Sequence, residues 1–181
     1  TETPICNFGE KAKNFDLLST ENKKTSLDNI KGKNGTLIMF ICNHCPYVKA
    51  VIKDIVKDAK YLETLGIKSA AIMSNDVKNY PEDSFENMIS FSKTHKFTFP
   101  YLIDETQEVA KEYGAVCTPD FFGYNKNLEL QYRGRIRELK NLKPTGKEDS
   151  DLNTAMKLIA LSGVGPKNQI PSMGCNIKWL K

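Results

Sequence analysis

The hydrophobic positions along the chain alternate between short continuous runs and longer stretches with helical spacing. The clearest continuous runs are residues 36–41, TLIMFI, and residues 67–73, IKSAAIM, and such runs are typical of strands buried on both faces of a sheet. Between them, apolar residues recur every three or four positions over residues 48–62, and this stretch ends at Gly66. The spacing predicts an amphipathic helix between two buried strands.

The rest of the chain continues this alternation. A second helical stretch begins at Pro81 and is expected to end near His95, and a strand-like run at 101–103 precedes a helical stretch over 105–113. A final helix is expected over 151–161. Two further strand-like runs flank NKN, as in a β-hairpin, and they are residues 121–124 and 128–132. This order predicts an α/β fold with a central mixed β-sheet flanked by helices on both faces.

The length and composition fit one compact domain followed by a short tail. The chain has 181 residues, of which 40% are hydrophobic, enough for a substantial core. We expect a domain over residues 1–162 and a C-terminal tail over residues 163–181, either packed on the domain or flexible. The charged residues 135–150 are expected to form a surface loop.

The charges and the lengths of the apolar runs favour neither a nucleic-acid partner nor a membrane-spanning segment. The 26 basic and 22 acidic residues are spread along the whole chain, and this mixed pattern does not favour nucleic acid. No stretch approaches the roughly 18 to 20 apolar residues of a membrane span, and the first residues lack an apolar signal core. We therefore expect a soluble protein, cytoplasmic in the first instance, with a mature periplasmic or secreted form as the alternative. The oligomeric state stays open.

The number and spacing of the cysteines indicate where the chain could carry out redox chemistry. The chain has five cysteines, an odd number, and Cys42 and Cys45 alone are close in sequence, in ICNHCPYV. A disulfide framework would use an even, distributed set, so the close pair favours a reactive dithiol over a structural disulfide. The other three cysteines are Cys6, Cys117 and Cys175.

The close pair lies where the strand at 36–41 gives way to the helix that begins near Pro46. The amino end of a helix carries partial positive charge and free amide groups, so a thiolate on Cys42 is favoured over a thiol. As an imidazolium, His44 would lie within reach of the Cys42 sulfur and stabilise the anion further. The sequence therefore predicts a lowered pKa for Cys42.

Two other interpretations of the pair remain. A C-x-x-C sequence is also half of a zinc site, but no second C-x-x-C or H-x-x-x-H occurs in the chain. We therefore expect no metal and no cofactor. The alternatives are an inert pair in the core and a low-turnover module that holds a metal through Cys42, His44 and Cys45.

Two long stretches resemble the thioredoxin-fold redoxins of the alkyl hydroperoxide reductase and thiol-specific antioxidant superfamily. They are FDLLSTENKKTSLDNIKGKNGTLIMFICNHC and YGAVCTPDFFGYNKNLELQYRG, and together they extend from Phe15 to Gly134. The resemblance implies a thioredoxin-like fold with an N-terminal strand extension. It also implies that Pro119 is a cis-proline packed against the dithiol, and that the backbone of Thr118 meets the substrate. CNHCPYV and the ending GCNIKW are similar to a peroxiredoxin-like group within these redoxins.

Three departures from better-known redoxins affect the expected chemistry. The peroxidase pattern P-x-x-x-[ST]-x-x-C fits neither Cys42 nor Cys45, and Arg133 in the late strand is more typical of a surface arginine than of a peroxidase arginine. Thioredoxin has a buried acid six residues before its first cysteine, where this chain has Thr36. His44 directly before the second cysteine resembles the C-P-H-C of periplasmic disulfide oxidants, which implies a dithiol more oxidising than thioredoxin.

These observations predict a thiol–disulfide oxidoreductase whose partners are protein or small-molecule thiols and disulfides. Cys42 is expected at the exposed end of the central strand, where it forms a mixed disulfide that Cys45 resolves. Thr118 and Pro119 are expected to position the partner. The alternative is a peroxiredoxin-like peroxidase that reduces hydroperoxides, with Cys175 as the resolving thiol.

We expect different roles for the two remaining candidate thiols, Cys117 and Cys175. Cys117, next to the predicted cis-proline, is expected to be a buried packing residue near the dithiol and is a candidate accessory thiol. Cys175 is the second candidate accessory thiol. It lies in a tail expected to be flexible, with Trp179 and Leu180 able to dock the segment on the domain.

Overall fold

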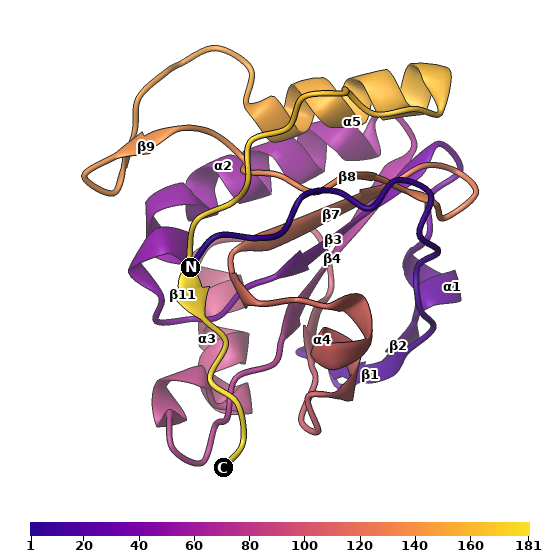
Figure 1. The fold of residues 1–181 in the computed structure, drawn as a ribbon. Coiled ribbons are helices and arrows are strands. Elements are labelled where there is room, and N and C mark those ends of the chain that lie inside the picture. Colours follow the sequence, from indigo (N-terminus) through magenta and orange to yellow (C-terminus); the bar gives the residue numbers. More distant parts are fainter.

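A seven-stranded mixed β-sheet forms the centre of the molecule in the computed structural model, which describes residues 1–181 (Figure 1). The strand order is β2-β1-β5-β4-β3-β7-β8. The strands are β1 (Asp16–Ser19), β2 (Lys24–Ser26), β3 (Gly35–Phe40), β4 (Ile67–Met73), β5 (Tyr101–Ile103), β7 (Asp120–Tyr124) and β8 (Leu130–Tyr132). The helices are α1 (Leu27–Ile30), α2 (Pro46–Glu63), α3 (Phe85–Thr94), α4 (Glu108–Tyr113) and α5 (Asp151–Ser162).

Strand β3 is an internal strand of the sheet, between β4 and β7, because both of its faces are apolar. It pairs with β4 in parallel and with β7 in antiparallel orientation. Leu37 and Met39 pack into the core on one face, whereas Ile38 and Phe40 pack into the core on the other. This alternation follows from the two-residue period of a strand and confirms the prediction that the run is buried on both sides.

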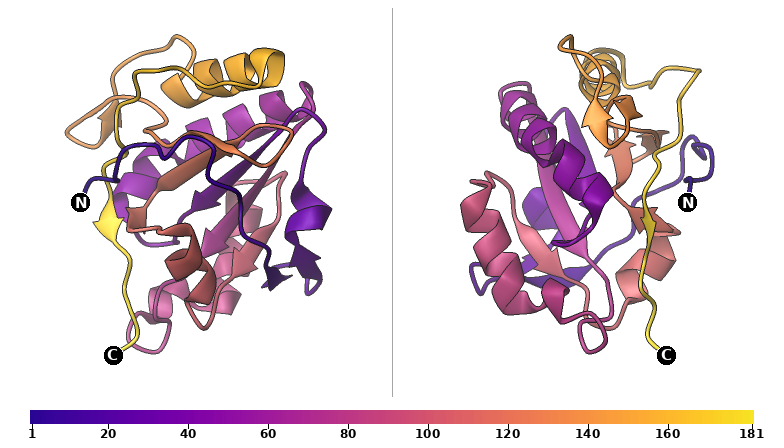
Figure 2. Two further views of the ribbon diagram at one scale, coloured as in Figure 1. Left: turned by 45° about the vertical axis from the view of Figure 1, so that its right-hand side comes forward. Right: turned by 90° about the vertical axis from the view of Figure 1, so that its left-hand side faces the viewer.

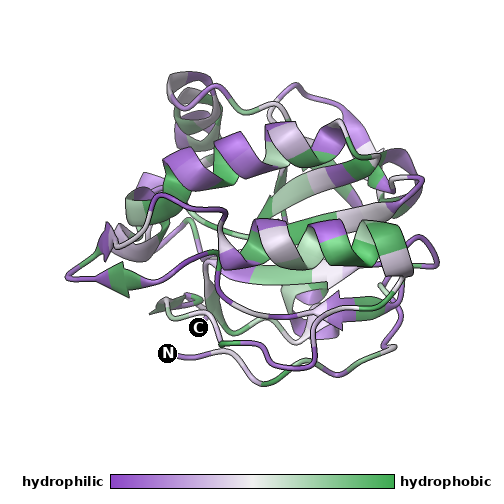
Figure 3. Cartoon of the chain, turned by 90° about the horizontal axis from the view of Figure 1, so that it is seen from above, coloured by the Kyte–Doolittle hydropathy of each residue, from purple (hydrophilic) through white to green (hydrophobic).

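Helices cover both faces of the sheet, as predicted (Figure 2). Buried residues of α2, α3 and α5 belong to one core, and those of α1 and α4 belong to the other. Hydrophilic and hydrophobic residues follow one another around the helices in Figure 3, as in amphipathic helices that bury one side. Strand β3 and helix α2, both packed in the core, therefore fix the position of the loop that joins them, residues 41–45.

Two helix boundaries differ from the predicted ones for local reasons. The stretch predicted as one helix from Pro81 is a 3₁₀ turn, η1 (Pro81–Asp83), followed by α3. Ser84 separates them, because its extended backbone and its side chain, which accepts a hydrogen bond from the Asn87 amide, form the N-cap of α3. Helix α4 begins at Glu108, three residues later than predicted, because Gln107 has a φ of 68°.

The N-terminal extension is a hairpin of β1 and β2 at the edge of the sheet, followed by the short helix α1. Ser26 and Asn29 form a capping box at the start of α1. The charged segment predicted as a surface loop contains a small hairpin of β9 (Leu139–Lys140) and β10 (Lys143–Pro144). None of the helices combines the length and the apolar character that crossing a membrane requires.

The C-terminal segment returns along the domain and meets the N-terminus (Figure 1). Strand β11 (Cys175–Asn176) pairs in antiparallel orientation with β6 (Cys117–Thr118), and the Thr1 amino group donates to the Gly174 carbonyl oxygen at 3.0 Å. Ile177 is the buried apolar residue of this segment, whereas Trp179 and Leu180 are 39% and 54% exposed. Both nevertheless contact the domain, as expected, because the Lys111 ammonium lies over the Trp179 ring and the Leu180 amide donates to the Gln107 Oε1 at 2.8 Å.

Candidate active site

Cys42 and Cys45 lie at the predicted junction between the central strand and the first long helix. Strand β3 ends at Phe40, Cys45 is the N-cap of α2, and Pro46 occupies the first turn, where its missing amide hydrogen leaves no helical bond unmade. All five cysteines are free thiols. Cys42 and Cys45 are 1% and 0% exposed, so the expectation of an exposed Cys42 is wrong. The reason is tertiary, because η1, β6 and β11 all lie against the loop that carries the pair.

Thr118 contacts both sulfurs of the pair. The Cys42 Sγ lies 3.5 Å from the Thr118 Oγ1, and the Cys45 Sγ lies 3.3 Å from the Thr118 carbonyl oxygen. The Thr118–Pro119 bond is cis, as the resemblance implies. The structure thus brings together the dithiol and the Thr-Pro turn, which are more than 70 residues apart in the sequence.

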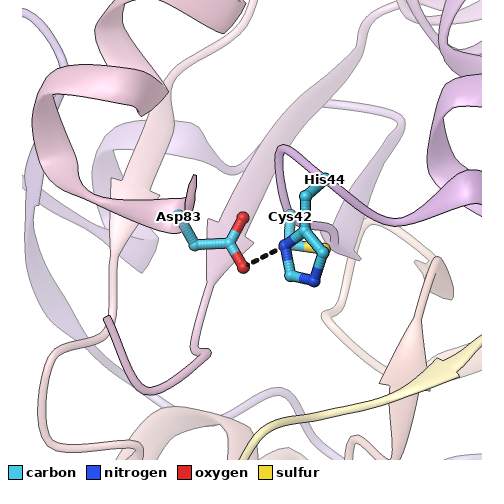
Figure 4. Close-up of side chains that lie close together, drawn as sticks. All are labelled: Cys42, His44 and Asp83. Atoms are coloured by element: carbon cyan, nitrogen blue, oxygen red, sulfur yellow. Dashed lines mark ion pairs between the residues drawn. The ribbon is translucent and has the colours of Figure 1, made fainter. Parts of the chain in front are cut away.

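A buried carboxylate that the sequence analysis did not identify completes the site. Asp83, at the end of η1 and 0% exposed, accepts hydrogen bonds from the Asn43 amide at 2.8 Å and from the Asn75 side chain at 3.0 Å. Its Oδ2 lies 2.6 Å from the Nδ1 of His44 (Figure 4). A buried carboxylate therefore lies beside the pair, although Thr36 occupies the position of the thioredoxin acid.

The sequence contained no clear signal for the role of Asp83. An acidic residue just after a proline is common in the exposed first turn of a helix, and the pattern predicted that position. The Ser84 break turns Asp83 toward the loop at 41–45 instead. Tyr101, whose sequence context predicts only a strand position, also reaches this loop and donates a hydrogen bond to the Asn43 Oδ1 at 2.7 Å.

The electrostatics of the pair differ from the sequence expectation. The pKa of Cys45 is lowered to about 5, first by a hydrogen bond from the Cys42 thiol and further by those from Cys175, Thr118 and the Val48 amide. The pKa of Cys42 is raised, first because its thiol donates to Cys45, then by burial and by the negative charge of Asp83. The prediction of a lowered pKa for Cys42 is therefore wrong, and the structure favours the thiolate on Cys45.

His44 is close to Cys42, as expected, but it does not act on the sulfur alone. The ligand atoms of Cys42, His44 and Asp83 all lie within 4.8 Å of one another. In Figure 4 the Asp83 carboxylate and the His44 ring point toward each other, with the Cys42 side chain beside the ring. The positive charge that the sequence analysis placed on His44 is therefore partly offset by the carboxylate of Asp83.

The same three side chains are the group in which a metal ion would find its ligands. This set differs from the one considered in the sequence analysis, because Asp83 takes the place of Cys45. Both carboxylate oxygens of Asp83 already accept hydrogen bonds from Asn43 and Asn75. The protein thus satisfies this carboxylate without a metal.

The two candidate accessory thiols lie on opposite strands of the β6–β11 pair. Cys117 is fully buried, its Sγ lies 3.7 Å from the Pro119 carbonyl oxygen, and burial and then Asp120 raise its pKa to about 12. Cys175 lies with its Sγ 2.7 Å from the Sγ of Cys45. The structure therefore brings the tail cysteine, rather than Cys117, into direct contact with the dithiol.

Arg133 is neither a surface residue nor directed at the dithiol. It is 8% exposed, and its guanidinium donates two hydrogen bonds to Asp120, at 3.2 and 2.9 Å, and one to the Gly114 carbonyl oxygen. It also lies over the ring of Phe122. The surface interpretation is wrong, because β8 places this arginine against the buried carboxylate that follows Pro119.

A cavity of about 430 Å³ lies next to the cis-proline. Pro119 and Tyr47 are among the residues that line it. Residues of the β9 region and of the C-terminal segment form the other walls, among them Ile136, Leu139, Ile170 and Met173.

A thioredoxin-like fold with a C-x-x-C pair facing a cis-proline turn defines the class of this protein as a thioredoxin-fold redoxin. The profile of the AhpC/TSA family matches residues 8–139, and the chain belongs to this family. It is a redox family, and its members include oxidoreductases of the peroxiredoxin-like kind.

Solved structures agree with this assignment. The chain is 38% identical to an uncharacterized conserved protein from Geobacillus kaustophilus, with a TM-score of 0.94 over 99% of this chain and 96% of that one. It is 34% identical to a hypothetical protein from Sinorhizobium meliloti 1021, with a TM-score of 0.90 over 99% and 97%. A thiol:disulfide interchange protein from Chlorobium tepidum shares the fold at 19% identity, with a TM-score of 0.63 over 84% and 97%. A search of the curated proteins found no match.

Proposed function

We propose that this protein is a thiol–disulfide oxidoreductase that exchanges disulfides through Cys42 and Cys45. The observation that carries the proposal is the contact of both sulfurs with Thr118, directly before the cis-proline. A dithiol at a helix N-terminus, next to a backbone edge that pairs with an extended segment, here β11 of the same chain, has the two parts that disulfide exchange requires.

The exchange proceeds in two balanced steps. The Cys42 thiolate attacks a sulfur of the partner's disulfide, forming a mixed disulfide and releasing the partner's other sulfur as a thiolate. The Cys45 thiolate then attacks the Cys42 sulfur, which forms the Cys42–Cys45 disulfide and releases the second partner sulfur. The partner gains two electrons and two protons, and the same steps in reverse oxidise a partner dithiol.

The surroundings of the pair suit this division of roles. In the mixed disulfide Cys42 has no thiol to donate, but the hydrogen bonds from Cys175, Thr118 and the Val48 amide still favour the Cys45 thiolate that resolves it. Cys42 must lose its proton before it attacks, and the His44–Asp83 pair beside it provides the acceptor. The His44 side chain is 26% exposed, so it can pass that proton to solvent.

Partner recognition is assigned to the surface next to the cis-proline. The cavity beside Pro119 has room for side chains of a partner polypeptide, with Tyr47 and Ile136 as apolar contacts. Thr118 is the backbone position at which an extended partner segment would pair, and the partner would have to displace Cys175 of β11, which pairs with Thr118 in this structure. We expect partners to be protein or small-molecule thiols and disulfides.

Turnover assays on single-cysteine variants test the proposal. The wild type is expected to catalyse insulin reduction by dithiothreitol or the oxidation of dithiothreitol, and Cys42→Ser is expected to abolish both. Cys45→Ser should accumulate a mixed disulfide on Cys42, because the resolving thiol is gone. Cys6→Ser is the control, since Cys6 does not contact the dithiol, and it should keep the wild-type rate. Equal rates for wild type and Cys42→Ser would contradict the proposal.

The same samples discriminate the other functions considered from the sequence. Hydroperoxide consumption that exceeds disulfide exchange would indicate a peroxidase, but the cation closest to that role, Arg133, is bound to Asp120. A stoichiometric metal in the purified protein would favour a metal-binding module at Cys42, His44 and Asp83. Elemental analysis measures the metal directly.

A further inference from the structure

The C-terminal segment is held along the active site by contacts from several elements. We call residues 172–178 the strap. The Ser172 hydroxyl donates to the Pro119 carbonyl oxygen at 2.7 Å, the Ile177 amide donates to the Val116 carbonyl oxygen at 3.2 Å, and the Lys178 amide donates to the Asn75 Oδ1 at 2.8 Å. In Figure 1 the strap is the segment labelled β11, and it passes beside the amino end of α2. The strap therefore occupies the edge at which a partner would pair.

Gly174 shows how closely the strap approaches this edge. A Cβ atom at Gly174 would lie 2.1 Å from the Thr118 carbonyl oxygen and 2.6 Å from its carbonyl carbon. Both are backbone atoms next to the cis-proline, so they cannot move aside without disturbing the site. Only glycine permits this approach, which brings the following residue, Cys175, to the dithiol.

The three sulfurs at the site differ in their access to solvent. Cys42 and Cys45 are almost completely buried, whereas Cys175 is half-buried. The Cys175 Sγ is 2.7 Å from the Cys45 Sγ, which is closer than two sulfurs in ordinary van der Waals contact. A small thiol in solution can therefore reach the dithiol most readily through Cys175.

We propose, on the basis of the proposed disulfide exchange, that Cys175 is a third redox thiol that carries electrons between the buried dithiol and small thiols in solution. In the first step the Cys175 thiolate attacks the Cys45 sulfur of the Cys42–Cys45 disulfide. A Cys45–Cys175 bond forms, the Cys42–Cys45 bond breaks, and Cys42 leaves as a thiolate that takes up the proton lost by Cys175. No electrons are gained or lost in this step, so it needs no further reactant.

The second step involves a low-molecular-weight thiol. Its thiolate attacks the Cys175 sulfur, forms a mixed disulfide there and releases Cys45 as a thiolate. A second thiol of the same kind then attacks that mixed disulfide, releasing Cys175 and forming the small disulfide. Cys45 is a good leaving group, because the Cys42 thiol and the Val48 amide stabilise its anion.

Disulfide mapping on variants tests the relay. Each protein is oxidised with diamide, quenched in acid, alkylated, and analysed by peptide mass spectrometry. The variant Cys42→Ser is expected to form an internal Cys45–Cys175 disulfide. Cys175→Ser is expected to form the Cys42–Cys45 disulfide, but glutathione should reduce it at least tenfold more slowly than it reduces the oxidised wild type. Cys6→Ser, which removes another half-buried thiol, should be reduced at the wild-type rate.

A strap variant provides a test that keeps all sulfurs. In the Cys42→Ser background, Gly174→Ala is expected to slow the formation of Cys45–Cys175 by at least tenfold, since the new Cβ displaces the strap. A circular dichroism spectrum checks that this variant is folded.

The outcomes separate the relay from the proposed function. The relay is overturned if Cys42→Ser forms no Cys45–Cys175 disulfide, or if oxidised Cys175→Ser is reduced as fast as the oxidised wild type. In either case, the proposed function still stands if Cys175→Ser forms the Cys42–Cys45 disulfide. Failure of Cys175→Ser to form that disulfide, together with inactive wild type in the insulin assay, would overturn the proposed function itself.

Discussion

The Asp83 carboxylate lies 2.6 Å from the Nδ1 of His44, and both side chains lie within 4.8 Å of the ligand atom of Cys42. This contact joins the 3₁₀ turn before α3 to the loop between β3 and α2. It places a buried negative charge beside a cysteine whose anion the helix N-terminus would otherwise favour. This charge adds to the hydrogen bond between the two sulfurs and to burial in raising the pKa of Cys42, and it leads to the first two predictions.

Replacing Asp83 with asparagine is expected to make Cys42 reactive at lower pH. The carboxylate raises the pKa of Cys42 by repulsion between like charges, and asparagine keeps the shape of the side chain without the charge. We expect the pH profile of Cys42 alkylation, followed by mass spectrometry, to shift down by about one pH unit or more. Glu82→Gln, at the exposed neighbouring position, is the control. An unshifted profile in Asp83→Asn would remove the carboxylate from the electrostatics of the site.

Replacing His44 with glutamine is expected to lower the reduction potential of the dithiol. Once His44 has accepted the Cys42 proton, its positive charge stabilises the thiolate of the reduced form, and loss of the histidine also leaves the Asp83 charge without its partner. Both effects disfavour the reduced state. A loss of about 1.4 kcal/mol would lower the potential by about 30 mV, which equilibration against glutathione can measure. His95→Gln, at the end of α3, should leave the potential unchanged, and an equal potential in both variants would contradict the role of His44.

The reduced protein is expected to hold a thiolate at neutral pH that depends on Cys45. With a pKa of about 5, this thiolate is present above about pH 5 and is lost as the pH falls through that value. Absorbance at 240 nm should show the transition in the wild type, and Cys45→Ser should lack it. A transition that persists in Cys45→Ser and disappears in Cys42→Ser would assign the anion to the other sulfur.

The same pKa shifts predict how the stability of the reduced protein depends on pH. Between about pH 5 and about pH 8.5 the folded protein has lost the Cys45 proton while the unfolded chain still binds it, so the free energy of unfolding rises with pH. The slope from one proton is at most about 1.4 kcal/mol per pH unit. Above about pH 8.5 the raised pKa values of Cys42 and Cys175 act in the opposite direction, so this contribution falls. Urea unfolding with reductant, compared between wild type and Cys45→Ser, measures the difference.

Replacing Arg133 with methionine is expected to destabilise the fold by about 3 to 5 kcal/mol. The substitution leaves the fully buried Asp120 without its ionic partner, and removing one member of a buried pair costs more than the pair itself contributes. The control is Arg135→Met, because the Arg135–Asp151 pair is partly exposed and should be worth less than about 1 kcal/mol. Similar midpoints of urea unfolding for the two variants would contradict this prediction.

Much of the fold could be predicted from local patterns. The runs at 36–41 and 67–73 are central strands because most of their residues are apolar on both faces, and such residues are stable only where both faces of the sheet are covered. Helix α2 follows from its three-to-four spacing. The break at Ser84 was missed because a capping serine inside an apolar stripe does not interrupt the stripe itself.

The site was predictable only in part, because its charges come from distant segments. The junction at Cys42 and Cys45 depends on neighbouring residues, and the cis-proline was implied by a motif that resembles known redoxins. Asp83 and Cys175 reach the dithiol through the packing of η1 and the pairing of β11 with β6.

The sequence by itself determined the layered α/β architecture and the position of two cysteines between the central strand and its helix. The reason is that the spacing of apolar residues and the residue types that begin a helix are local properties of the chain. The tertiary structure alone decided that both sulfurs are buried, that Cys45 rather than Cys42 is the favoured anion, and that a third thiol contacts the pair. The physical reason is that a thiol's pKa and access depend on groups within a few ångströms in space, and folding brings those groups from three separate parts of the chain.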